Sequence, residues 1–180
     1  RFGGEFTETT RHFYPDLTFG SNRPLRGGKM STYEGGVRVP GIFYWPGVLS
    51  SDEPFTQPAW IADLLPTFLD FAGIPLPEGV DYDGVSLRPA LARGADIGDR
   101  PFVFGGVQPN AMRFGEWKLV MPNQSRVVSP ESEEPMLYNL SDDIGESRNL
   151  ASEKPEQIQN MIELMEAEVA EMAADTVSRR

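Results

Sequence analysis

The stretch RPLRGGKMSTYEGGVRVP, residues 23–40, determines most of what can be inferred from this chain. In it, Lys29 lies between two glycine pairs, Gly27-Gly28 and Gly35-Gly36. Because glycine has no side chain and opens the backbone conformations that tight loops need, a bound oxyanion can approach such a lysine closely. The pattern indicates an anion-binding loop in which Lys29 supplies the positive charge.

The charge distribution agrees with a small-anion site. The chain has 180 residues, of which 27 are acidic and 16 basic, giving a net charge of −11. Such a surface repels a polyanion, so we expect no nucleic-acid partner. Between residues 21 and 50 the balance reverses, because four basic residues face Glu34 alone and the local charge is +3. The alternative interpretation for Arg26 and Arg38 is that they pair with carboxylates elsewhere.

The same stretch resembles a segment of type I sulfatases, enzymes of the alkaline-phosphatase-like superfamily. In that segment a Gly-Lys pair, a small or hydroxyl residue, Thr-Tyr/Trp-Glu-Gly-Gly and Arg-x-Pro surround a lysine that binds the substrate sulfate. The similarity continues, in the family's order, through residues 41–47, 61–73, 83–87, 113–119 and 137–143. This resemblance implies that Lys29 is a catalytic, sulfate-binding cation. Met30, where a small residue is common, and Arg23, where glycine is common, depart from the pattern.

The resemblance also implies what the chain does not carry. The family's nucleophile is a formylglycine made from Cys or Ser in a Cys/Ser-x-Pro/Ala-x-Arg motif, and the chain has no cysteine and no matching serine motif. The family's N-terminal Asp pair and the Asp-Asn-Gly element that precedes the lysine loop, which bind its metal, do not occur either. Ser21-Asn22 is a poor substitute because Ser21 has no carboxylate. We therefore expect the C-terminal part of a longer enzyme. Calcium or magnesium and formylglycine would belong to the full enzyme, and this chain would bind no metal.

Two further residues are candidates for substrate binding. Arg23 precedes the loop, where its charge can alter access to the sulfate site. His12 is the only histidine of the chain and matches no position of the family, so we interpret it as a loop residue that could line the mouth of the site. The expected partners are a sulfate ester, aryl or carbohydrate, and the missing N-terminal catalytic portion.

The fold class predicted is α/β, the C-terminal portion of a sulfatase sandwich followed by a small antiparallel sheet. In the first part, residues 1–99, residues 37–45 predict a strand buried on both faces. Residues 63–72 predict a helix with Asp63 as its N-cap and a buried face of leucine and phenylalanine. Residues 86–93 predict a further short helix.

In the second part, residues 100–180, the pattern changes to short strands at 102–104, 112–121 and 135–140, with a hairpin signal at 114–116. Alternation places Trp117 and Leu119 on one face of the sheet and Lys118 and Val120 on the other. From Pro155 to Ala174, apolar residues recur every three or four positions, which predicts an amphipathic helix lying on this sheet.

Two other functions remain open. One is a phosphodiester or phosphonate hydrolase of the same superfamily, and the other is a detached structural domain without catalysis. No run of the sequence approaches the roughly 18 apolar residues of a membrane span, so no membrane partner is expected. The absence of cysteine does not decide between a cytoplasmic and an exported protein.

Overall fold

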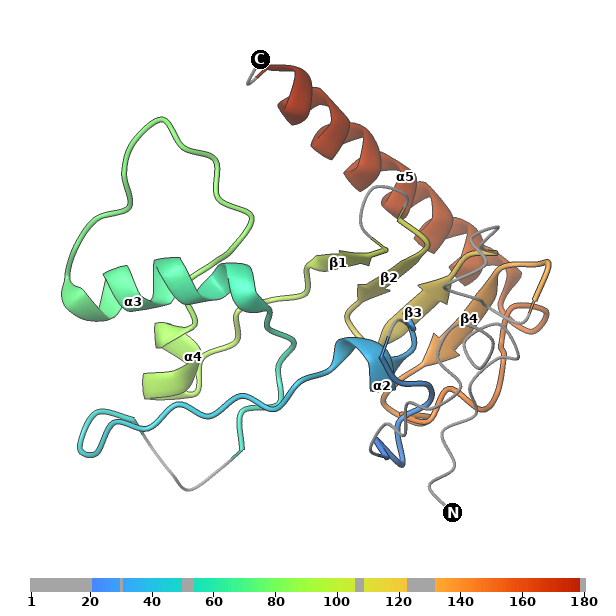
Figure 1. Ribbon diagram of the computed structural model, residues 1–180, viewed down its shortest axis with the longest axis horizontal. Helices are drawn as coiled ribbons and strands as arrows, with labels where there is room; N and C mark the ends of the chain where they lie inside the picture. Colours follow the sequence, from blue (N-terminus) through green and yellow to red (C-terminus); the bar gives the residue numbers. More distant parts are fainter. Residues whose placement is uncertain (1–20, 30, 50–53, 106–108, 123–131, 179–180) are drawn as a thin grey trace, which may run out of the picture. The chain divides into compact units, whose positions relative to one another are not determined.

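Figure 1 shows the computed structural model, which describes residues 21–29, 31–49, 54–105, 109–122 and 132–178. Two compact units are present, one made of residues 1–39 and 100–180, the other of residues 40–99. This division differs from the expected 1–99 and 100–180. The described residues 21–39, which carry the Lys29 loop, belong to the same unit as the small sheet.

The small sheet has four antiparallel strands in sequence order. They are β1 (Pro101–Phe104), β2 (Ala111–Phe114), β3 (Trp117–Val120) and β4 (Met136–Asn139). Gly115, in the turn between β2 and β3, has φ 57°, a conformation that favours glycine. The predicted antiparallel sheet and its hairpin are therefore confirmed.

One face of the sheet is covered by the long helix α5 (Pro155–Ser178), as predicted. Met112, Leu119 and Leu137 point to this face and pack against Met161 and Met165 of the helix. The helix therefore lies across the strands (Figure 1), and Met161 and Met165 fill the core, whereas Met172 is 44% exposed. Of the described helices, none is long and apolar enough to cross a membrane.

The opposite face of the sheet packs against the N-terminal segment. Ala111, Val120, Met136 and Tyr138 form a core with Tyr33, which directly precedes α2 (Glu34–Val37). Lys118 lies on this face too, next to Tyr138 in the register of β3 and β4. The sequence thus folds the glycine-rich stretch onto the sheet.

The unit of residues 40–99 holds the 3-10 turn η1 (Ile61–Asp63), α3 (Leu64–Ala72) and α4 (Arg88–Arg93). Both predicted helices are present, and Gly73 ends α3 in the left-handed region. Asp63 does not cap α3 with its side chain. Its carboxylate instead accepts the N–H groups of Trp60 and Val85, 2.9 Å from each, and so fixes two loops.

The buried face predicted for α3 is wrong in part. Leu65 and Phe68 are more than half exposed, whereas Pro66 and Thr67 are buried. The Thr67 hydroxyl accepts a hydrogen bond from the N–H of Leu87, 2.8 Å away. The buried side of α3 therefore makes a polar contact with the residue just before α4. The apolar residues of α3 therefore do not all face the unit's own interior.

The strand predicted at residues 37–45 is also wrong. Residues 38–45 form no strand, and the side chains of Val39, Ile42 and Tyr44 are 84%, 91% and 86% exposed. A strand needs a neighbour for its backbone N–H and C=O groups, and the described residues supply none here. The segment has a strand's composition without a strand's pairing.

The packing of α5 on the sheet yields a stability prediction. Met161 is only 2% exposed, so Met161→Ala leaves a cavity between α5 and the sheet and should lower the free energy of unfolding by about 2–5 kcal/mol. Chemical unfolding followed by circular dichroism measures this. The matched control is Asn160→Ala, at the neighbouring exposed position, which should stay within about 0.5 kcal/mol. Equal losses in the two variants would contradict this packing.

Candidate functional site

The backbone of the Lys29 loop is closed by its own hydrogen bonds. The N–H of Gly35 donates to the carbonyl of Arg26 over 2.7 Å, and the N–H of Ser31 donates to the carbonyl of Gly28 over 3.0 Å. A Cβ on Gly35 would lie 2.5 Å from the Arg26 carbonyl oxygen, and one on Gly36 only 2.0 Å from that of Ser31. Both glycines are therefore required by close backbone approach, which explains the glycine pair chemically.

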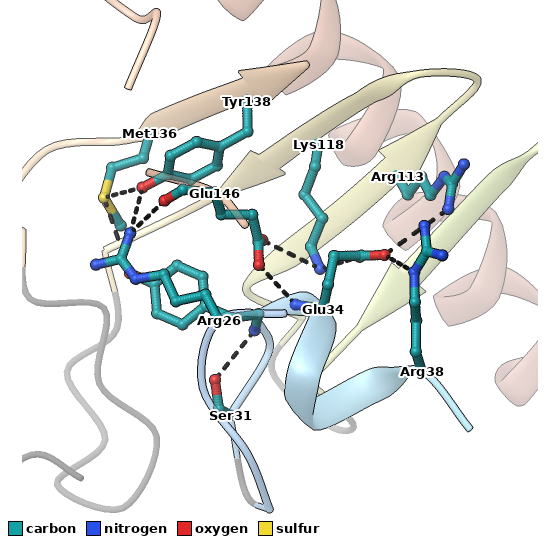
Figure 2. Close-up of polar contacts among 10 residues, drawn as sticks. Arg26, Ser31, Glu34, Arg38, Arg113, Lys118, Met136, Tyr138 and Glu146 are labelled. Atoms are coloured by element: carbon teal, nitrogen blue, oxygen red, sulfur yellow. Dashed lines mark hydrogen bonds and ion pairs between the residues drawn. The ribbon is translucent and has the colours of Figure 1, made fainter. Parts of the chain in front are cut away.

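Arg26 and Tyr33 hold the loop onto the sheet. The guanidinium of Arg26 donates to the hydroxyl of Tyr138 at 3.1 Å and to the carbonyl of Glu146 at 2.8 Å (Figure 2). It also stacks over the ring of Tyr33, 4.1 Å from the centroid, which is a cation–π distance. Tyr33 and Tyr138 meet edge to face, with ring centroids 6.4 Å apart. Arg26 thus holds the loop to the sheet unit through a hydroxyl, a backbone carbonyl and an aromatic ring, and these contacts are not the carboxylate pairing of the alternative interpretation.

Directly behind the loop lies a buried cluster of three charged residues, drawn in Figure 2: Glu34, Lys118 and Glu146. Each side chain is no more than 1% exposed. The Lys118 Nζ lies 2.6 Å from Glu34 Oε1 and 3.5 Å from Glu146 Oε1. Glu146 Oε2 accepts the backbone N–H of Glu34 at 2.7 Å, so the two acids are connected through backbone as well as through Lys118.

The register of the sheet explains why these residues meet. Arg113 pairs with Lys118 across β2 and β3, and Lys118 pairs with Tyr138 across β3 and β4. Paired residues of neighbouring strands share a face, so the three side chains form one cross-strand row. Glu34 lies over this row from α2, and Arg38, the residue that follows α2, forms an ion pair with the same carboxylate. Arg113 lies 3.8 Å from it.

The two carboxylates have opposite electrostatic situations. Burial raises the pKa of Glu34, but the charges and hydrogen bonds of Lys118 and Arg38 outweigh burial and hold this pKa below 4.5. For Glu146, burial dominates the lowering effects of Lys118 and of the Glu34 N–H, and the pKa rises from 4.5 to about 7. The cluster therefore combines a carboxylate that stays charged with one that titrates near neutral pH.

The structure places the predicted site residues as follows. Lys29 is exposed, and it lies five residues before Glu34 in the loop that the cluster supports. Arg23 is also exposed, at the start of the same segment. His12 lies outside the described residues, so its place as a substrate-binding residue stays a prediction.

Comparisons with known proteins identify the chain's relatives. Human steryl-sulfatase is 41% identical over 85 residues, which cover 47% of this chain and 15% of the relative. Human arylsulfatase A is 34% identical over 164 residues, which cover 78% of this chain and 32% of the relative. The crystal structure of PsFucS1 sulfatase from Pseudoalteromonas sp. matches 91% of this chain and 35% of its own, with a TM-score of 0.68 and 25% identity. The chain belongs to the sulfatase family.

The match to sulfatases has two limits. No protein-family model matches the chain. The chain also spans only about a third, or less, of the length of these sulfatase relatives. The similarity thus establishes the family and the α/β fold class of this chain.

The residues described in this sulfatase chain do not fit a divalent metal. Among residues 21–178, apart from the gaps named above, no group of three or more His, Cys, Asp or Glu side chains could hold one. Glu34 and Glu146 lie close together, but the Lys118 ammonium occupies the space that a cation bridging them would need.

Sequence reasoning missed the buried cluster, although one signal for it exists. Alternation along β3 places Lys118 on the same face as Val120, which makes it a lysine at a core position of the sheet. A buried lysine requires a buried carboxylate. Glu34, in the middle of the glycine-rich stretch, was an available partner, but nothing in the sequence indicated that this stretch would pack on β3.

Glu146 gives a pH prediction. Its pKa is about 7 in the folded chain and near 4.5 in the unfolded chain, so between these values the folded state holds a proton that the unfolded state has lost. Protonated Glu146 therefore contributes about 3 kcal/mol to the free energy of unfolding, at 1.36 kcal/mol per pKa unit. This contribution is complete below pH 4.5 and is lost as the pH rises through 7. Because the pKa of Glu34 is lowered, its contribution changes only below pH 4.5.

Unfolding titrations at pH 5 and pH 8 measure this effect. The free energy of unfolding should fall more between the two pH values in the wild type than in Glu146→Gln, which cannot titrate. Glu153→Gln, at an exposed carboxylate, should behave as the wild type does. Parallel pH dependence of the wild type and Glu146→Gln would contradict the prediction.

Proposed function

We propose that this chain belongs to an enzyme that hydrolyses sulfate esters, in which Lys29 binds the sulfate group. The observation that carries the proposal is the combination of sulfatase similarity over 78% of the chain with a rigidly closed, sheet-anchored loop around Lys29. These contacts hold the backbone on both sides of Lys29, which gives the exposed lysine side chain a fixed base from which to reach an anion.

Lys29 acts through electrostatics. An ammonium group is a compact charge with three donors, able to contact the oxygens of a sulfuryl group from several directions. As the ester bond breaks, charge builds on those oxygens and on the leaving oxygen, and a preplaced cation stabilises that charge more than it stabilises the bound ester. Arg23, at the start of the same segment, adds positive charge beside the site, and His12, outside the described residues, is kept as a candidate substrate-binding residue.

The remaining catalytic groups come from another part of the enzyme. By its likeness to sulfatases, the enzyme uses a formylglycine and a calcium or magnesium ion, both held outside this chain. The exposed segment 38–45 supports such a partner, because Val39, Ile42 and Tyr44 are apolar, extended and without strand pairing in the described residues. Pairing with a strand of the catalytic portion would bury these side chains and satisfy the backbone.

A substitution at Lys29 tests the role of the loop. In the complete enzyme, Lys29→Ala should lower kcat/KM for an aryl sulfate by roughly 10²-fold, which is about 3 kcal/mol of transition-state stabilisation. Because Lys29 is exposed, thermal unfolding should change little. Steady-state kinetics and calorimetry of the same preparations measure the two effects.

The matched control is Lys154→Ala, an exposed lysine just before α5, which should keep wild-type kinetics. Wild-type turnover by Lys29→Ala would refute the role of the loop. Turnover of an aryl phosphodiester in place of the sulfate ester would identify the enzyme as a phosphodiester hydrolase. If Lys29→Ala changed the turnover of neither ester, a structural role for this chain would be favoured.

A second experiment concerns the chain alone. With no cysteine and no serine motif for formylglycine, residues 1–180 should show no turnover of an aryl sulfate when purified by themselves. Adding the separately expressed catalytic portion should restore activity if the two parts associate. Turnover by the chain alone, in a preparation free of other sulfatases, would contradict the proposed division of the site.

A further inference from the structure

We propose that the buried cluster of Glu34, Lys118 and Glu146 is a positioning device, which fixes where the Lys29 loop presents its ammonium group. The inference rests on the proposed function, because it concerns the same sulfate site. It adds three residues to that site, none of which touches the substrate.

The cluster joins three segments that are far apart in the sequence. Lys118 comes from the centre of the sheet, Glu34 from α2, and Glu146 from the turn that follows β4. The Glu34 N–H and the Glu146 carboxylate connect the two outer segments directly, 112 residues apart, and Arg26 adds a bond to the Glu146 carbonyl. Glu146 adopts φ 51°, an uncommon conformation for a residue with a side chain, which these contacts maintain.

Stability alone does not account for such a cluster. Removing two or three charges from water costs free energy that their mutual attraction only offsets, and apolar side chains of similar volume often stabilise a core as well or better. What charged groups add is an anchor, because moving Glu34 away from its 2.6 Å contact with Lys118 would leave both charges buried and unpaired. An apolar contact would allow α2 to shift or rotate on the sheet.

The path from the cluster to Lys29 is short and stiff. Glu34 is the first residue of α2, and the next residue, Gly35, donates to the carbonyl of Arg26 on the other arm of the loop. A Cβ at Gly35 or Gly36 would collide with backbone, so the two arms have no room to slide. A displacement of Glu34 therefore moves both arms, and with them Lys29.

A double-mutant cycle in the complete enzyme tests the device. The variant used is Lys118→Met combined with Glu34→Gln, which removes this ion pair at nearly constant volume. Glu146, which also loses Lys118 in this variant, has a pKa of about 7 and can stay neutral by keeping its proton. We expect this paired variant to fold and to lower kcat/KM for an aryl sulfate at least tenfold. Competitive inhibition by inorganic sulfate should weaken by a similar factor.

The decisive measurement repeats this in the Lys29→Ala background. If the cluster acts through Lys29, adding the paired variant to Lys29→Ala should lower kcat/KM by less than a further twofold, because the ammonium that the cluster positions is absent. The control is Arg148→Gln with Glu153→Gln, an exposed ion pair of the same unit, which should leave both backgrounds unchanged. Should the paired variant unfold, Glu146→Gln takes its place, since it keeps an acceptor for the Glu34 N–H and leaves Lys118 paired with Glu34.

The outcomes separate this proposal from the proposed function. Equal losses in both backgrounds, with Lys29→Ala itself costing about 10²-fold, would mean that the cluster supports the fold generally, and would overturn the positioning role alone. Full activity and wild-type sulfate inhibition in a folded variant would overturn it too. If Lys29→Ala is silent, the sulfate-binding role of the loop fails first, and the positioning role fails with it.

Discussion

The contact between Lys118 and Glu34 is the constraint on which the arrangement of this chain depends. A lysine at the centre of a buried sheet face cannot remain without a partner, since an isolated buried charge is among the most costly groups in a protein interior. The carboxylate that meets it comes from the glycine-rich stretch 84 residues earlier. The charge requirement of β3 therefore decides which segment covers the second face of the sheet, while the apolar stripe of α5 covers the first.

This pairing explains the composition of the glycine-rich stretch. Glu34 is held by the sheet, Tyr33 fills the core beside Tyr138, and Gly35 and Gly36 let the two arms of the loop approach to backbone contact. Lys29 is exposed at the other end of the same loop. One short segment thus contains both an anchoring half and a half left accessible to an anion, which is how a mobile side chain such as lysine can be presented from a fixed base.

The sequence predicted elements whose patterns are local. Pro155 and the apolar repeat from Ile158 to Val169 identified α5, and the alternation around Gly115 identified the β2–β3 hairpin. It failed where long-range pairing decides the outcome. Residues 38–45 have strand composition but no neighbouring strand in the described residues, and Leu65 and Phe68 of α3 are exposed although their spacing is that of a buried face. The cluster was missed because its three residues belong to three segments that only the fold brings together.

The two units of the chain differ in how their charged and apolar side chains are satisfied. The sheet unit pairs its buried lysine internally, with Glu34 shared among Lys118, Arg38 and Arg113, while Glu146 Oε1 is buried without a hydrogen bond and lies 3.5 Å from Lys118 Nζ. The unit of residues 40–99 has the opposite character. Its polar contacts are satisfied locally, as at Asp63, while its large apolar side chains at Ile42, Tyr44 and Phe68 face outward. Since apolar area exposed to water costs free energy in proportion to its extent, covering these side chains would stabilise the unit of residues 40–99, whereas the lysine loop is held by the other unit.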